Sequence, residues 1–167
     1  AEGGLTLAEV RRIGVVEGDP QLQFARIRSI AVDTAGDIWV VDGHEGVRSY
    51  DSTGNYVRVV GSVGRGPGEA QGYARVWHTG DEILLFGFPA VLPRFTSSGE
   101  FRESVLPRTA GGSIISPLGH AQDQWFFTVL DYGTGAAQTF RPITHIAASP
   151  DLTNEIDTLL TFPGQLS

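Results

Sequence analysis

The chain has 167 residues, of which 41% are hydrophobic and 19% are charged, the balance of a folded domain with an apolar core. The formal net charge is −7 and every cationic side chain is arginine, so we expect no nucleic-acid partner. Cysteine is absent, which excludes a disulfide framework and a thiolate metal site, and no apolar run approaches the roughly 20 residues that span a bilayer.

The first segment in chain order resembles a strand that recurs further on. The stretch VRRIGVVEGDP (10–20) matches VRVVGSVGRGP (57–67). We therefore expect 10–16 to be a stray strand that belongs to a neighbouring repeat unit. Its candidate assembly residues are Val10, Arg12, Ile13 and Val15. The opening AEGG suits the mature side of a signal-peptidase cleavage site, which predicts an extracellular or periplasmic location.

Residues 24–61 form the first complete unit. Runs rich in Val, Ile, Tyr and Trp cover about 25–33, 36–42, 46–51 and 55–61, and turn sequences separate them. This pattern predicts four short antiparallel strands. Asp33 and Asp51 lie in two of the turns, where we expect their carboxylates to accept backbone N–H groups.

The second unit covers 70–106 and the third covers 111–162. The first two units align without a gap, so that Gly54 falls on Gly99, His78 on Asp33 and Gly87 on Asp42. In the third unit Trp125 aligns with Trp39, and the connection that follows is longer. Because Trp39, Trp77 and Trp125 recur at matching or adjacent positions, we expect them in the core between units.

A period of about 45 residues with four strands per unit is typical of a β-propeller blade. The fold class predicted is therefore all-β. The chain, 1–167, would be a single partial propeller of about three blades, with the strand 10–16 in front of them. A β-sandwich of unequal hairpins is the alternative.

Three stretches carry a family resemblance: IAVDTAGDIWVVD, VRSYDSTGNYVRVVG and GRGPGE. They resemble the NHL-type, six-bladed β-propeller family of bacterial exported proteins. The resemblance implies about half of a six-bladed ring. Because terminal blades expose an apolar face, three explanations stay open: a fragment of a longer protein, two copies that close a ring, or a head-to-tail filament.

Candidate site residues are few. Asp42, Glu45 and Asp131 lie at or near the ends of second strands, where they would line one mouth of a channel and bind a ligand. The histidines His44, His78, His120 and His145 are not equivalent between units, so we interpret them as surface residues. We name no catalytic residue, no metal ligand and no cofactor, although bound Ca²⁺ stays open.

The function predicted is a non-catalytic binding or assembly module outside the cytoplasm, whose partner is another protein or a second copy. This interpretation rests on fold-level analogy and on the absence of catalytic motifs. One alternative is a propeller hydrolase or lyase that uses a divalent cation in its channel. The other is a structural subunit of an extracellular filament.

Overall fold

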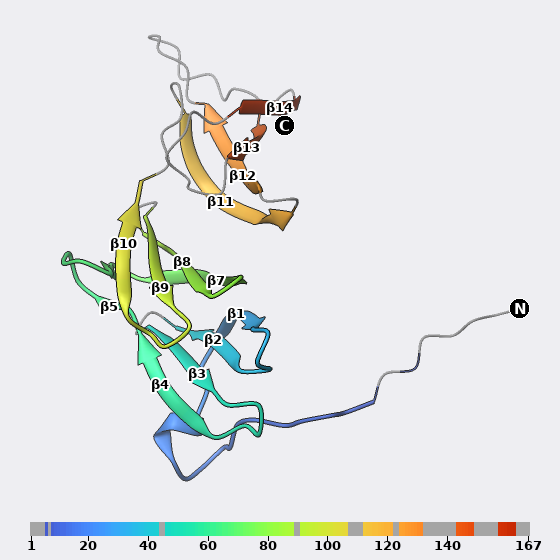
Figure 1. The fold of residues 1–167 in the computed structure, drawn as a ribbon, viewed down its shortest axis with the longest axis vertical. Helices are drawn as coiled ribbons and strands as arrows, with labels where there is room; N and C mark the ends of the chain where they lie inside the picture. Colours follow the sequence, from blue (N-terminus) through green and yellow to red (C-terminus); the bar gives the residue numbers. More distant parts are fainter. Residues whose placement is uncertain are drawn as a thin grey trace, which may run out of the picture.

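The computed structural model shows an all-β chain whose blade-like sheets follow one another along the sequence (Figure 1). It describes residues 6, 8–43, 46–88, 91–106, 112–121, 124–131, 143–148 and 157–162. Within these, the description covers the backbone alone at 112–117, 129–131, 143–148 and 157–162.

Each of the three large sheets has four antiparallel strands in chain order. Sheet 1 consists of β1 (Ile27–Val32), β2 (Ile38–Asp42), β3 (Val47–Tyr50) and β4 (Tyr56–Val60). Sheet 2 consists of β7 (Tyr73–Thr79), β8 (Glu82–Gly87), β9 (Leu92–Thr96) and β10 (Phe101–Val105). Sheet 3 consists of β11 (Gly112–Ala121), β12 (Gln124–Asp131), β13 (Ile143–Ala148) and β14 (Asp157–Phe162). The predicted all-β class is confirmed.

Two short elements lie outside these sheets. A 3-10 turn, η1 (Pro20–Leu22), precedes sheet 1, and the carboxylate of Asp19 caps it by accepting the N–H of Gln21. A small parallel pair, β5 (Ser62–Val63) with β6 (Glu69–Ala70), forms in the connection between sheets 1 and 2.

Aspartates fix two turns of sheet 1, as predicted. Asp33 Oδ1 accepts the backbone N–H groups of Ala35 and Asp37. Asp51 Oδ1 accepts the backbone N–H groups of Thr53 and Asn55. Side-chain bonds from Thr53 and then Asn55 hold the pKa of Asp51 well below its usual range.

Apolar side chains fill the two spaces between consecutive sheets. Between sheets 1 and 2, Trp39 and Val41 pack with Val76 and Leu85. Between sheets 2 and 3 lies a second cluster, made of Leu84, Phe86, Leu92, Val105, Trp125 and Phe127. Sheet 2 is therefore buried on both faces, as an inner blade requires.

The first hairpin of sheet 2 departs from the ungapped alignment. In sheet 1 the N–H of Asp33 bonds to the carbonyl of Asp37, so the turn between these two residues has three residues, 34–36. In sheet 2, Thr79 pairs directly with Glu82, so the turn has two. His78 consequently lies at the place of Val32 and not of Asp33. The alignment was wrong here because a turn can lose one residue without changing the strands that it joins.

The two buried tryptophans are not equivalent either. Trp39 faces sheet 2 from sheet 1, whereas Trp125 faces sheet 2 from sheet 3. Both lie in the core, as predicted, and Trp125 meets the partly buried Trp77 edge-on at 5.8 Å between ring centroids. A shift of one residue along a strand moves a side chain to the opposite face, which the sequence alignment could not detect.

Candidate functional site

Sheet 1 has apolar side chains on both faces, but only one face packs against another described sheet. The register of β1 and β7 places Ile27 at the position of Tyr73 and Ile30 at that of Val76. Tyr73 and Val76 are 1% and 2% exposed, whereas Ile27 and Ile30 are 49% and 56% exposed. The difference arises because sheet 1 covers sheet 2, and no described sheet covers sheet 1.

We call this surface the open face of sheet 1. It carries four exposed aliphatic side chains, which are Ile27, Ile30 and Val32 on β1 and Val59 on β4. A contiguous apolar patch on a folded protein marks an interaction surface. Sequence reasoning missed these residues. The available signal was that apolar residues occupy both odd and even positions in 27–32 and 38–42, as in strands buried on both faces.

The segment that precedes β1 is clamped onto the same face. Asp42 is buried, with 7% of the residue exposed. Its carboxylate accepts the backbone N–H groups of Ala25 at 3.0 Å and Arg26 at 2.6 Å. We call the contacts of Asp42, Arg48 and Tyr50 with residues 21–26 the N-terminal clamp. They hold the chain where it enters β1.

The other two members of the clamp bind carbonyl groups. Arg48 Nη1 donates to the carbonyl oxygen of Gln23 at 2.7 Å, and the Tyr50 hydroxyl donates to that of Gln21 at 2.7 Å. The Phe24 ring lies 5.7 Å from the Tyr50 ring and 5.7 Å from the Arg48 guanidinium carbon. Burial raises the pKa of Tyr50 above its usual value.

The connection between sheets 1 and 2 is held in a different way. Glu69 accepts the N–H of Gly66 at 2.7 Å and the hydroxyl of Ser62 at 3.1 Å, and these bonds lower the Glu69 pKa. The hydroxyl of Tyr73 donates to the carbonyl of Gly68 at 2.7 Å. Burial raises the pKa of Tyr73. The connection is therefore anchored to sheet 2 by hydrogen bonds.

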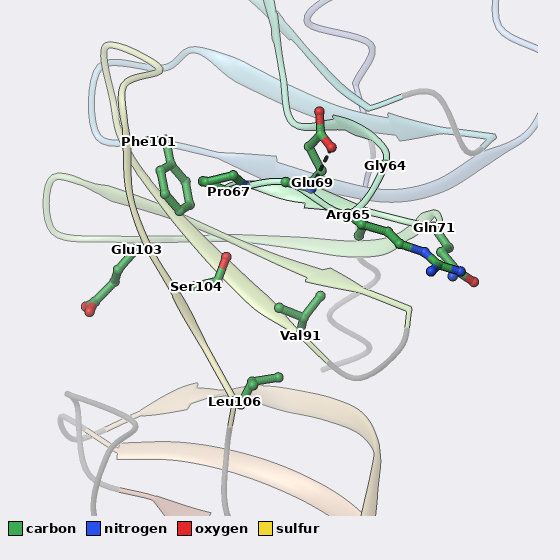
Figure 2. Close-up of a pocket in the computed structure, with 12 residues that line it drawn as sticks. Gly64, Arg65, Pro67, Glu69, Gln71, Val91, Phe101, Glu103, Ser104 and Leu106 are labelled. Atoms are coloured by element: carbon green, nitrogen blue, oxygen red, sulfur yellow. Dashed lines mark hydrogen bonds between the residues drawn. The ribbon is translucent and has the colours of Figure 1, made fainter.

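A groove of about 710 Å³ lies between this connection and β10 (Figure 2). Figure 2 shows Phe101 beside Pro67 in one part of the groove, and Val91 and Leu106 in another. A hollow of about 690 Å³ on sheet 1 is lined by the clamp residues Phe24, Asp42 and Arg48, among others. The polar groups of the clamp in this second hollow are already bonded to the protein.

Of the three predicted ligand-binding residues, Asp42 alone has a described side chain. Asp42 belongs to the N-terminal clamp, and Glu45 lies outside the described residues. Asp131 ends β12, where its backbone pairs with Gly112. Ligand binding by these residues stays a prediction.

The histidines occupy unrelated places. His78 is half-buried in β7, the His120 ring lies 4.8 Å from that of Trp125, and His145 lies in β13. His44 lies outside the described residues. Within the described ranges, no three His, Asp or Glu residues gather as a metal site would require. No helix of the described structure is long and apolar enough to cross a membrane.

The predicted assembly residues lie in an extended segment beside sheet 1. Residues 8–15 form no strand. Val10 is fully exposed, Arg12 pairs with Glu9, and Ile13 is half-buried. The N–H of Val15 donates to the carbonyl of Leu22 at 2.9 Å. The segment is therefore partly docked, although it is unpaired as a strand.

Comparisons with known proteins identify no family. No protein-family model matches the chain, and no curated protein matches it. Among solved structures it is similar to Sqt1 from Saccharomyces cerevisiae, with a TM-score of 0.46 and 11% identity over 90% of this chain and 35% of that one. It is also similar to the computationally designed Ika4 protein, with a TM-score of 0.48 and 10% identity over 93% of this chain and 100% of that one. The chain spans about a third of the length of Sqt1.

Proposed function

We propose that this chain is part of an exported, NHL-type β-propeller that acts as a non-catalytic protein-binding module. The open face of sheet 1 is its binding surface. One observation carries the proposal: Ile27 and Ile30 are about half exposed, while the residues at the same positions of sheet 2 are buried by a neighbouring sheet.

The energetic reason is the apolar area that stays in water. Burial of apolar surface stabilises a complex by about 25 cal/mol per Å² before the costs of association are subtracted. Ile30 and Val32 on β1, together with Val59 on β4, place this surface along both edges of sheet 1. A protein partner can therefore contact the sheet at its two outer strands, while residues 21–26 cover Asp42 and Tyr50 on the strands between them.

A site-specific photo-crosslinking amino acid at position 30 tests this proposal. The matched control places the same amino acid at Leu118 in β11, which is 53% exposed, close to the 56% of Ile30. In an extract of the cells that make the protein, position 30 should give a discrete protein adduct and position 118 should not. Val59→Asp, on the same face, should abolish the adduct. The same diffuse labelling at both positions would contradict the proposal.

A further inference from the structure

β10 is the outer strand of sheet 2, and one of its two edges has no partner among the described strands. The order of the sheet is β10-β9-β8-β7, so β10 pairs with β9 alone. An unpaired strand edge presents backbone N–H and C=O groups to which another strand can bind. The register of β9 and β10 decides which residues of β10 present them.

The backbone groups of Ser104 point to the free edge of β10. Successive residues of an antiparallel strand direct their N–H and C=O groups to opposite sides. The N–H of Thr96 bonds to the carbonyl of Glu100 in the turn before β10, so the backbone groups of Arg94 also face β10 and those of Pro93 face β8. Ser104 lies opposite Pro93. It therefore forms no backbone bonds with β9 and directs its own N–H and C=O groups outward.

The side chain of Ser104 faces the groove that lies between β10 and the connection from sheet 1. Val105 packs in the cluster between sheets 2 and 3. Because side chains alternate along a strand, its neighbours Ser104 and Leu106 face the other way, and both line the groove. A strand added to β10 would therefore place every second side chain in this groove of about 710 Å³.

The walls of the groove are apolar and are held in place before any partner binds. Leu106 is 68% exposed. The Phe101 ring covers Gly68, where a Cβ would lie 2.7 Å from Cδ2 of the ring, and it meets Phe95 edge-on at 5.6 Å between centroids. Figure 2 shows this ring beside Pro67. A preformed wall loses less conformational entropy when a partner packs against it.

The groove offers one cation to a partner. Its two carboxylates are already bonded, because Glu69 accepts hydrogen bonds from its own connection and Glu103 pairs with Arg94 at 2.8 Å. Arg65 is exposed, and its guanidinium forms no hydrogen bond or ion pair with another residue of the described structure. Figure 2 shows Arg65 on the side of the groove where Gln71 lies. The charge that complements this end of the groove is a carboxylate.

We propose that β10 and residues 64–71 form an edge groove that binds an extended segment of a partner protein as a fifth strand of sheet 2. The segment carries apolar side chains at positions i and i+2, and a carboxylate on the same face pairs with Arg65. Backbone bonds to Ser104 provide affinity, and the groove selects the side chains. This site lies on sheet 2, away from the open face of sheet 1, so it goes beyond the proposed function.

The corresponding edge of sheet 1 lacks these features and provides an internal control. Val59 occupies on β4 the position that Ser104 occupies on β10. In the repeat, Gly61 stands in place of Leu106 and Gly18 in place of the groove arginine. The hollow beside Val59 has a volume of about 260 Å³. The edge of β4 therefore has neither the apolar wall nor the cation of the edge groove.

A displayed library of random nine-residue peptides, selected on the full chain, tests the proposal. Enriched peptides should carry Val, Ile, Leu or Phe at i and i+2, with Asp or Glu at an even spacing from them. Selection on Arg65→Glu should enrich Lys or Arg at that place instead. The most enriched peptide, labelled with a fluorophore, should bind Arg65→Ala about two- to fivefold more weakly than the wild type, and salt should reduce this difference.

A proline variant separates strand addition from apolar contact. Ser104→Pro removes an outward N–H and keeps the bonds to β9, which an edge strand tolerates. The labelled peptide should bind this variant at least about tenfold more weakly. Ser104→Ala and Val59→Pro, the same change on β4, should bind it as the wild type does. In the unmodified chain, hydrogen exchange at the Ser104 amide should slow when the peptide is added.

Four results would overturn the edge-groove proposal. One is a selection that enriches no peptide. Another is an enriched pattern that Arg65→Glu leaves unchanged, together with an unprotected Ser104 amide. A third is a peptide that binds Ser104→Pro as well as the wild type; if Ile30→Asp then releases it, the peptide occupies the open face of sheet 1. The fourth is a concentration-dependent dimer in which the Ser104 amide is protected, because a second copy would then be the partner.

Discussion

The carboxylate of Asp42 offers the sharpest test of how the N-terminal segment is held. Its oxygens accept the N–H groups of Ala25 and Arg26, and Arg48 lies 3.7 Å away. We compare Asp42→Ala, which removes both acceptors, with Asp42→Asn, which keeps the shape but offers one acceptor oxygen and no charge. Both changes leave the strands of sheet 1 in place.

The magnitude follows from the number and exposure of these bonds. A hydrogen bond to a charged group contributes about 1.5–3 kcal/mol to stability. Ala25 and Arg26 are exposed, so water replaces the lost acceptor and the lower value applies. Asp42→Ala should therefore cost about 3 kcal/mol and Asp42→Asn about 1.5 kcal/mol.

Urea unfolding followed by tryptophan fluorescence measures these costs, since Trp39 is buried in the same sheet. Hydrogen exchange at Ala25 and Arg26 shows whether the loss is local. Asp37→Asn is the matched control, because the Asp37 carboxylate makes no hydrogen bond or ion pair with another described residue and only its backbone N–H is bonded. This variant should stay within about 0.5 kcal/mol of the wild type. If Asp42→Ala were as stable as this control, the clamp would not stabilise the N-terminal segment.

Two further predictions concern buried contacts. Burial raises the pKa of Tyr50 and Tyr73 in the folded state, so their contribution to stability is complete below the unfolded value of 10.0 and is lost as the pH rises above it. Urea unfolding between about pH 9 and pH 11 should show this fall, and a double Tyr→Phe variant should show less of it; equal slopes would refute the assignment. A Cβ at Gly87 would overlap that of Ala70, so Gly87→Ala should destabilise the protein by about 1–3 kcal/mol. Ala70→Gly should restore most of this loss, and a double variant less stable than the single one would contradict the packing argument.

The contact at Gly87 also explains a difference between the first two repeats. Asp42 and Gly87 end the second strands of sheets 1 and 2. In sheet 1 the carboxylate reaches the N–H of Ala25, whereas in sheet 2 the methyl group of Ala70 fills the corresponding space. Asp42 therefore holds the chain segment that enters sheet 1, whereas Tyr73 and Glu69 hold the corresponding segment that enters sheet 2.

Much of the architecture could be predicted from residues that act locally. The turn aspartates Asp33 and Asp51 bond to N–H groups within four residues, so their role depends on nearby sequence alone. The spacing of turns and β-branched runs likewise determined the number of strands in each sheet. These features identify an all-β repeat protein because each one is a local preference of the backbone.

Tertiary structure decided which face each side chain covers and which surface stays open. Trp39 and Trp125 align in the sequence but point at sheet 2 from opposite sides, because a one-residue shift reverses a strand's faces. Ile30 and Val76 have similar side chains, and only the presence of a neighbouring sheet makes one exposed and the other buried. The burial of a side chain depends on which other elements pack against it in space. The type of the residue and its place in the repeat therefore do not determine its exposure.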